Sequence, residues 1–271
     1  MQLKADKDGY NDLYKDTVSK LISSPSKEDY SERFRRIGLS PFYEGGSTKG
    51  YVRGLAVEAL FREVENRGLS PGEVHILDGG CGQGELSVFL AAHGFQVIGV
   101  DISEEAKRAS MHLASVVGVS QSCRFLAESL ERISLPDQSI DFVIGHAALH
   151  HFIKYEGVAA ELERVLKHGG EMFFADSFGE NRIYHIFHDT EKMHRLGDMI
   201  LTRKLIRSFF RDFDVEIVPT DWFVMLDKLL QKLLPVTATA IVRRLSYLWW
   251  HMDPTFRGSR SALFPILRWS F

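Results

Sequence analysis

The stretch Val74–Gly94, VHILDGGCGQGELSVFLAAHG, constrains the fold of this chain more than any other. Its first four residues form a short, mostly apolar run, which is typical of a buried parallel strand, whereas Glu85–Ala92 repeats apolar residues at helical spacing. Glycines remove side chains where a backbone bends sharply and approaches another molecule, and here they stand at Gly79, Gly80, Gly82 and Gly84. The pattern therefore predicts a strand that turns into a helix around a ligand.

Composition places the chain among ordinary globular proteins. Its 271 residues are 45% hydrophobic and 25% charged, which is enough for a sizeable core in one large domain with additions. The 33 basic and 36 acidic residues leave a net charge of -3, so we expect no nucleic-acid partner. Two cysteines are too few for a disulfide scaffold, and the N-terminus MQLKADKDGY lacks the apolar core of a secretory signal. We therefore expect a cytoplasmic protein.

Strand-like and helical segments alternate through the middle of the chain. This alternation predicts an α/β fold with a doubly wound, Rossmann-like, mostly parallel sheet that carries helices on both faces. The expected strands are Val74–Leu77, Gln96–Val100, Cys123–Ala127, Ile140–Gly145, Glu171–Ala175 and Val215–Val218, and the expected helices are Leu86–His93, Glu104–Val116 and Val158–Leu166. Residues 263–271 would add a seventh strand, antiparallel to the strand near Val215. The ligand of such a sheet lies outside the carboxyl ends of its strands.

The rest of the chain is assigned around this core. We expect a helical N-terminal cap at 1–70, the ligand-binding core at 71–220 with a lid at 177–200, a helical insertion at 221–262 and the final core strand at 263–271. Within the insertion, residues 222–250 are interpreted as helices packed on the domain or on a partner in a homodimer. Peripheral membrane contact is the alternative. No segment approaches the roughly 20 uncharged apolar residues of a membrane-spanning helix.

The glycine spacing separates two classes of adenosine-containing cofactor. Rossmann dehydrogenases space their glycines as G-x-G-x-x-G around a pyrophosphate, whereas the last three glycines of this turn follow G-x-G-x-G. Asp78 beside the turn would repel a pyrophosphate and suits a ligand with an ammonium group. Asp101 ends the next strand, where a carboxylate accepts hydrogen bonds from ribose hydroxyls. Its neighbour Ile102 offers an apolar surface to adenine.

At these motifs the sequence resembles the class I S-adenosylmethionine-dependent methyltransferases, specifically their small-molecule branch (methyltransferase type 11), which includes ubiquinone and menaquinone biosynthesis enzymes. The resemblance covers about residues 74–218. The stretch ILDGGCGQG resembles the D-x-G-C-G-x-G motif, VIGVDIS the ribose-binding strand end, SLPDQSIDFVIGHAALHHF the fourth-strand region, and ELERVLKHGGEMFFAD the helix, glycine turn and fifth strand. It implies S-adenosyl-L-methionine as the cofactor and methyl transfer to a small molecule as the reaction.

The resemblance, for Asp78, Gly80, Asp101 and the loop near Ser129, and the positions of the other residues after the strands together indicate which residues hold the cofactor. They are the turn residues Asp78, Gly80, Cys81, Gly82 and Gly84, then Asp101 for the ribose, Ile102, Glu128, Ser129 and Leu130 for the adenine, and His146 for the methionine end. Ser129 stands where the family usually has an adenine-contacting aspartate, and the adjacent Glu128 is a candidate substitute. Cys81 is interpreted as a small side chain that fills space under the turn rather than as a nucleophile.

Methyl transfer from a sulfonium is an in-line displacement. The enzyme therefore has to hold the donor methyl group and the acceptor atom close together, in line and away from water. An acidic acceptor gains from a general base, and His150 and His151 are the candidates, with pocket lining as their alternative role. Candidate substrate contacts are Tyr43, Tyr184, His185 and His188. No metal is expected, because the histidines of the lid lack a carboxylate or cysteine at a recognised spacing.

These features predict methyl transfer to a small, hydrophobic metabolite, with oxygen as the first candidate for the methylated atom. Carbon or nitrogen of an aromatic or lipid-linked acceptor is the alternative. A non-catalytic S-adenosylmethionine-binding protein and an NAD-dependent dehydrogenase remain as functions of other classes.

Overall fold

The computed structural model describes residues 2–23, 48–176, 197–218 and 264–268. The elements are α1 (Gln2–Ser23), α3 (Thr48–Asn66), the short 3-10 turn η1 (Pro71–Glu73), β1 (His75–Gly79), α4 (Glu85–Ala92), β2 (Gln96–Asp101), α5 (Glu104–Val117), β3 (Cys123–Ala127), β4 (Ile140–His146), α6 (Leu149–Phe152), α7 (Gly157–Val165), β5 (Leu166–Ala175), α10 (Arg203–Phe209), β6 (Asp214–Val218) and β7 (Phe264–Arg268). Most of the expected lid and all of the expected insertion lie outside the described residues.

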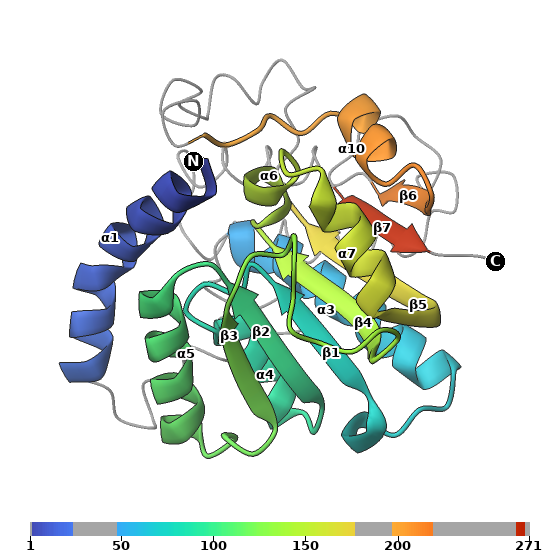
Figure 1. Cartoon of the computed structure of the whole chain (residues 1–271). Coiled ribbons are helices and arrows are strands. Elements are labelled where there is room, and N and C mark those ends of the chain that lie inside the picture. Colours follow the sequence, from blue (N-terminus) through green and yellow to red (C-terminus); the bar gives the residue numbers. More distant parts are fainter. Residues whose placement is uncertain (1, 24–47, 177–196, 219–263, 269–271) are drawn as a thin grey trace, which may run out of the picture.

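The strands form one sheet in the order β3-β2-β1-β4-β5-β7-β6. Strands β1 to β5 pair in parallel, whereas β7 runs antiparallel to both of its neighbours, β5 and β6. In Figure 1, α3 and α4 lie behind the sheet and α7 lies in front of it. The predicted α/β fold with a mostly parallel sheet is therefore confirmed. The strand order reverses between β1 and β4, which is where a ligand of such a sheet binds.

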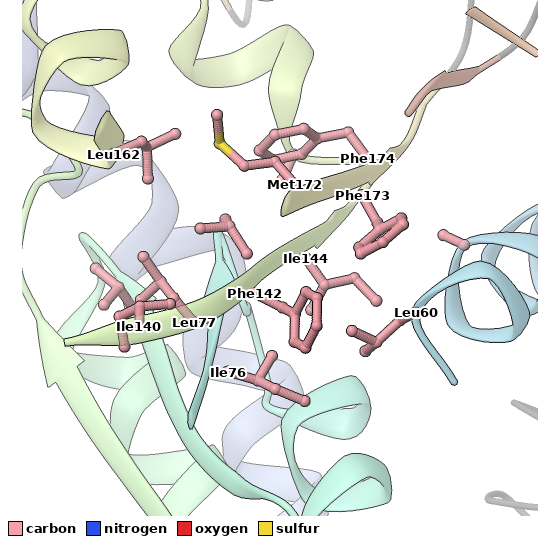
Figure 2. Packing of buried hydrophobic residues seen from close by; sticks show 14 of the residues in the cluster. Leu60, Ile76, Leu77, Ile140, Phe142, Ile144, Leu162, Met172, Phe173 and Phe174 are labelled. Carbon is pink, nitrogen blue, oxygen red and sulfur yellow. The ribbon is translucent and has the colours of Figure 1, made fainter. Parts of the chain in front are cut away.

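Apolar side chains from both faces of the sheet build the core. Figure 2 shows Leu60 of α3 beside Phe142 and Phe173, while Leu162 of α7 lies on the side of Met172. These five side chains are at most 2% exposed. Alternate residues of a strand face opposite sides, so β4 and β5 contribute to both layers. Each such side chain stabilises the fold by about 1.5–3 kcal/mol, which fixes the carboxyl ends of the central strands.

Helix α5 shows why the local sequence forms these elements. Ser103 is its N-cap, and its hydroxyl accepts a hydrogen bond from the backbone N–H of Ala106 at 3.2 Å. Gly118 ends the helix in the left-handed conformation. Most boundaries differ from the prediction by one or two residues, and the largest difference is at β5. Leu166 was expected to end a helix but is instead the first residue of this strand, where it pairs with Ile140.

The N-terminal helix α1 packs along α5 (Figure 1). Asn11 joins the two helices, because its Oδ1 accepts a hydrogen bond from the Ser103 hydroxyl at 2.7 Å. The helical character expected for the N-terminal segment is thus present in α1 and α3. Within the described part of the chain, no helix is long and apolar enough to cross a membrane.

Candidate functional site

The glycine turn after β1 is held against the end of β2. The backbone N–H groups of Gly80 and Cys81 both donate to the carbonyl oxygen of Val100, at 2.8 and 3.0 Å. Gly80 has φ +75°, and a Cβ added there would lie 2.6 Å from the Cβ of Ala148. Only glycine combines this conformation with so close an approach, so the turn lies directly on the connection between β4 and α6.

Asp101 closes the turn from the next strand. Its Oδ2 accepts a hydrogen bond from the backbone N–H of Gly82 at 3.0 Å, and its Oδ1 accepts one from Ser103 at 2.9 Å. Burial raises the pKa of the Asp101 carboxyl, and the two backbone N–H groups partly offset that rise. The carboxylate is therefore fixed in orientation at the carboxyl end of β2.

A cavity of about 280 Å³ opens above the turn. Its walls come from α1, the β1 turn, the ends of β2 and β3, and the segment from β4 into α7, and they consist of Asp6, Tyr10, Tyr14, Gly80, Cys81, Gly82, Val100, Asp101, Ile102, Glu128, Ser129, Leu130, His146, Ala147, Ala148, His151, Phe152, Tyr155 and Val158. The structure thus brings most of the predicted cofactor residues, together with His151, around one space.

Three predicted site residues lie outside this wall. Asp78 is 1% exposed and sits beneath the turn, where its Oδ2 accepts a hydrogen bond from the Ser87 hydroxyl at 2.6 Å. Gly84 starts α4, and a Cβ there would lie 2.6 Å from Ser110. His150 points toward Asp176 instead of the cavity. The carboxylate and the glycine therefore shape the turn from below.

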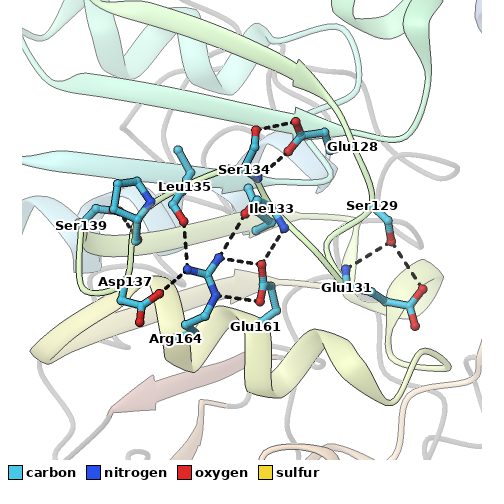
Figure 3. A network of polar contacts seen from close by, with 11 residues as sticks. Glu128, Ser129, Glu131, Ile133, Ser134, Leu135, Asp137, Ser139, Glu161 and Arg164 are labelled. Atoms are coloured by element: carbon cyan, nitrogen blue, oxygen red, sulfur yellow. Dashed lines mark hydrogen bonds and ion pairs between the residues drawn. The ribbon is translucent and has the colours of Figure 1, made fainter.

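The loop after β3 presents Glu128 and Ser129 to the cavity while tying both into local contacts (Figure 3). The Glu128 carboxylate accepts hydrogen bonds from the backbone N–H and hydroxyl of Ser134, at 2.8 and 2.5 Å. The Ser129 hydroxyl accepts one from the backbone N–H of Glu131 at 3.2 Å. Glu128 therefore supplies a fixed negative charge at the place where Ser129 supplies none.

The surroundings of Cys81 do not favour a role as a nucleophile. Its Sγ would lie 2.9 Å from a Cβ added to Gly99 of β2, so it fills the space under the turn. Burial and the nearby carboxylates of Asp78 and Asp101 hold the pKa of its thiol well above the usual value. A thiol of this kind stays neutral, and the nucleophile is the thiolate.

The two candidate bases lie next to each other on the short helix α6. Ala147, with φ +51°, turns the chain from β4 into this helix, and its backbone N–H donates to the carbonyl oxygen of Ala175 at 2.8 Å. The rings of His150 and His151 are 3.8 Å apart between centroids. Nδ1 of His150 lies 2.7 Å from Asp176, whereas His151 reaches the cavity.

His151 has two polar partners on the same nitrogen. Its Nδ1 lies 2.7 Å from Oδ1 of Asp198 and 2.7 Å from the hydroxyl oxygen of Tyr10. An ionised carboxylate only accepts hydrogen bonds, so the contact with Asp198 fits a proton on Nδ1 of His151. In the neutral imidazole this is the tautomer that a general base requires.

His150, His151 and Asp198 also offer ligand atoms within 4.8 Å of one another, the arrangement of a small metal site. Sequence spacing did not indicate this trio, because Asp198 is distant in the chain and comes close only in the fold. Each imidazole Nδ1 already lies 2.7 Å from a carboxylate oxygen. His151 and Asp198 therefore either form a histidine–carboxylate dyad or, with His150, hold a metal.

Sequence reasoning missed the wall that α1 provides. Asp6, Tyr10 and Tyr14 all line the cavity. Their spacing of four residues places them on one face of a helix, and this spacing is the signal that the sequence offered. The predicted substrate residues Tyr43, Tyr184, His185 and His188 lie outside the described part of the chain.

Comparisons with known proteins give the fold a family context. Residues 77–174 match the family model described as "Methyltransferase domain". An uncharacterized methyltransferase, YcgJ, of Bacillus subtilis is 30% identical over 127 residues, which are 45% of this chain and 50% of the relative. The sterol 24-C-methyltransferase ERG6B of Gibberella zeae is 37% identical over 112 residues, which are 40% of this chain and 28% of the relative. The match thus spans half or less of these relatives.

A solved structure agrees with the fold over a longer part of the chain. A putative sarcosine dimethylglycine methyltransferase from Galdieria sulphuraria superposes with a TM-score of 0.54 over 80% of this chain and 87% of the other, at 20% sequence identity. At this identity the likeness concerns the fold alone.

Proposed function

Because residues 77–174 form a class I methyltransferase domain, whose cofactor is S-adenosylmethionine, we propose that the protein transfers a methyl group to an oxygen atom of a small, hydrophobic metabolite. In this reaction the bond between the methyl carbon and sulfur breaks, and a carbon–oxygen bond forms. The proton of the acceptor hydroxyl passes to His151, and S-adenosylhomocysteine leaves. The chain holds the two reactants in line and accepts that proton.

One observation carries the choice of oxygen. His151 is in the cavity wall, and Asp198 at 2.7 Å from Nδ1 favours the tautomer whose Nε2 has a free lone pair. A hydroxyl or phenol must lose its proton during methylation, so a positioned base assists it. His150 has a similar dyad with Asp176 but lies outside the wall. We therefore assign the base to His151 and a structural role to His150.

The charges around the cavity support the cofactor assignment. Asp6, Asp101 and Glu128 contribute three acidic side chains to the wall, which complement the positive sulfonium and ammonium groups of the cofactor. Asp101 would accept hydrogen bonds from the ribose, as its place at the end of β2 implies. The adenine would lie between Ile102 and the loop at Ser129.

The first test is calorimetric titration with S-adenosylmethionine, S-adenosylhomocysteine and NADH in parallel. We expect the first two to bind and NADH not to bind. Asp101→Ala should weaken S-adenosylhomocysteine binding at least about tenfold, since charged hydrogen bonds are lost. Glu73→Ala is the matched control, because this exposed carboxylate of η1 lies outside the cavity wall. Equal affinity in both variants contradicts the role of Asp101.

The second test compares the two histidines. His151→Gln should lower turnover of phenolic acceptors about 10²-fold or more while leaving cofactor affinity within twofold, because general-base catalysis contributes on this scale. His150→Gln is the matched control and should lose much less. Turnover should also survive EDTA. Its loss with EDTA, and its return with added Zn²⁺ or Mn²⁺, would reassign the histidines and Asp198 to a metal site.

A second candidate is methylation at carbon. The relative from Gibberella zeae is named a sterol 24-C-methyltransferase and is 37% identical in the matched part, which favours an apolar acceptor methylated at carbon. A panel of phenols, prenylated phenols and sterols, assayed with isotope-labelled S-adenosylmethionine, separates the two candidates. Label found only on sterol carbon would replace the oxygen assignment.

A further inference from the structure

Helix α1 reaches the cavity through a stripe of polar and aromatic side chains. Asp6 hydrogen-bonds the hydroxyl of Tyr155 and forms an ion pair with Lys154 at 2.7 Å. One turn later, the Tyr10 hydroxyl lies 2.7 Å from Nδ1 of His151. One further turn along, the hydroxyl of Tyr14 lies 3.0 Å from the position of a Cβ on Gly82. A single helix face therefore touches both the cofactor turn and the candidate base.

We propose that Tyr10 is a positioning residue for His151, and that docking of α1 couples closure of the cofactor cavity to the arrangement of this base. The inference rests on the proposed role of His151. It adds a part of the chain that lies more than 100 residues from the dyad in sequence and outside the matched methyltransferase domain.

The contacts of Tyr10 fix the imidazole ring in two ways. Its hydroxyl shares Nδ1 with Asp198, and its ring meets the His151 ring edge-on, with centroids 5.3 Å apart and planes at 74°. On another side, His150 lies 3.8 Å from His151 between ring centroids. With Asp198, His150 and Tyr10 around it, the imidazole has little freedom to rotate away from the cavity.

Tyr10 acts here as a neutral hydroxyl. Burial, followed by the negative charge of Asp198, raises the pKa of its phenol well above the usual value. Nδ1 has one proton, which the Asp198 carboxylate and the Tyr10 oxygen both approach, so the O–H of Tyr10 remains available as a donor. Tyr10 therefore orients the base and does not compete with it for the acceptor proton.

The coupling follows from the rigidity of a helix. Tyr10 and Tyr14 are one turn apart on α1, so displacement of this helix removes Tyr14 from the glycine turn and Tyr10 from His151 together. A cofactor that prefers the covered cavity then also favours the ordered base, because a ligand shifts a two-state equilibrium toward the state that it binds better.

Two conservative variants separate positioning from binding. Tyr10→Phe keeps the ring and removes the hydroxyl next to His151, so we expect kcat to fall about tenfold, the effect of one hydrogen bond, with cofactor affinity within twofold. Tyr14→Phe removes a hydroxyl beside the cofactor turn, and we expect it to raise the KM for S-adenosylmethionine with little change in kcat. Two variants that change kcat and KM alike would overturn the positioning role.

Two readouts that need no turnover test the coupling itself. Imidazole ¹⁵N spectra, assigned with His151→Gln, should show the Nδ1–H tautomer of His151 in the wild type and a mixture of tautomers in Asp198→Asn. Hydrogen exchange should show that S-adenosylhomocysteine protects residues 2–23 in the wild type and protects them less in Tyr10→Phe. Unchanged exchange on ligand binding refutes the coupling, even where His151→Gln abolishes turnover. Full turnover in His151→Gln instead refutes the proposed base.

Discussion

Gly80 and Gly118 both adopt the left-handed conformation, at φ +75° and +83°, but only one of them meets a neighbour. A Cβ at Gly80 would lie 2.6 Å from Ala148, whereas nothing lies within 4 Å of a Cβ at Gly118. Gly118→Ala should therefore lower the free energy of unfolding only by the cost of placing alanine in the left-handed conformation, about 1 kcal/mol. Gly80→Ala should lower the free energy of unfolding by more and should also abolish binding of S-adenosylhomocysteine.

Urea unfolding with and without S-adenosylhomocysteine measures both effects. A bound ligand at 100 times its Kd stabilises a protein by about 2.7 kcal/mol, so this increment should persist in Gly118→Ala and disappear in Gly80→Ala. Equal losses of stability and equal ligand increments in the two variants would show that the approach of Ala148 does not matter.

At the scale of residues, local structure was predictable and remote contacts were not. The glycine turn and the place of Asp101 at the end of β2 could be located because they depend on a few neighbouring residues, while their contacts with the cofactor stay predictions. Tyr10 could not be paired with His151, because their contact joins residues 141 positions apart. Asp198 could not be paired with His151 for the same reason, although its Oδ1 lies 2.7 Å from Nδ1 of His151.

At the scale of elements, Arg164 ties the loop after β3 to α7 (Figure 3). Its guanidinium donates to the carbonyl oxygens of Ile133 and Leu135 and to Glu161, at 2.7 to 3.0 Å. Glu161 also accepts the backbone N–H of Ile133 at 2.6 Å. The loop that presents Glu128 and Ser129 is thereby anchored on a helix.

This anchor predicts a pH dependence of stability. The hydrogen bonds from Arg164 hold the pKa of Glu161 below its ordinary value of 4.5. As the pH falls, Glu161 is therefore protonated in the unfolded chain before it is protonated in the folded protein. The stabilisation is complete above about pH 4.5 and is lost as the pH falls through the lowered pKa of the folded state. Glu161→Gln should cost about 1 kcal/mol at pH 7.

Thermal unfolding from pH 7 to pH 3.5 checks this expectation. The difference between the wild type and Glu161→Gln should shrink below pH 4.5. A difference that stays constant over this range means that the charge of Glu161 adds nothing to the anchor. Lys167→Gln, whose ammonium contacts Asp141 at 2.8 Å elsewhere on the domain, is the control for a general effect of charge.

The boundary between α7 and β5 at Leu166 could not be predicted from periodicity alone. An apolar residue at this position fits the repeat of α7 and also the start of β5. Leu166 belongs to the strand because it pairs with Ile140 of β4. A contact with a distant strand is not part of a local sequence pattern. The types of the predicted core elements, in contrast, were correct because their apolar repeats are long enough to distinguish helix from strand.

At the scale of the whole molecule, β7 lies between β5 and the edge strand β6. Its antiparallel pairing with the strand near Val215 was predicted, and the structure places Val215 opposite Leu267. The prediction did not include β5, which pairs with the other edge of β7. Because β7 lies far along the chain from both partners, only the assembled sheet reveals that it separates them.

Because β7 lies between β5 and β6, this side of the sheet depends on β7. In the described sheet, β6 pairs with β7 and β7 pairs with β5, so a chain that ends at residue 263 loses both ladders and exposes the edge of β5 at Glu171–Phe173. We expect this truncation to lower the unfolding midpoint and to promote aggregation, since an unpaired edge strand is a template for association. A chain that ends at residue 268 keeps β7 and is the matched control. If both truncations unfold at the midpoint of the full chain and remain monomeric by light scattering, β7 does not hold this edge, and the sheet is complete without it.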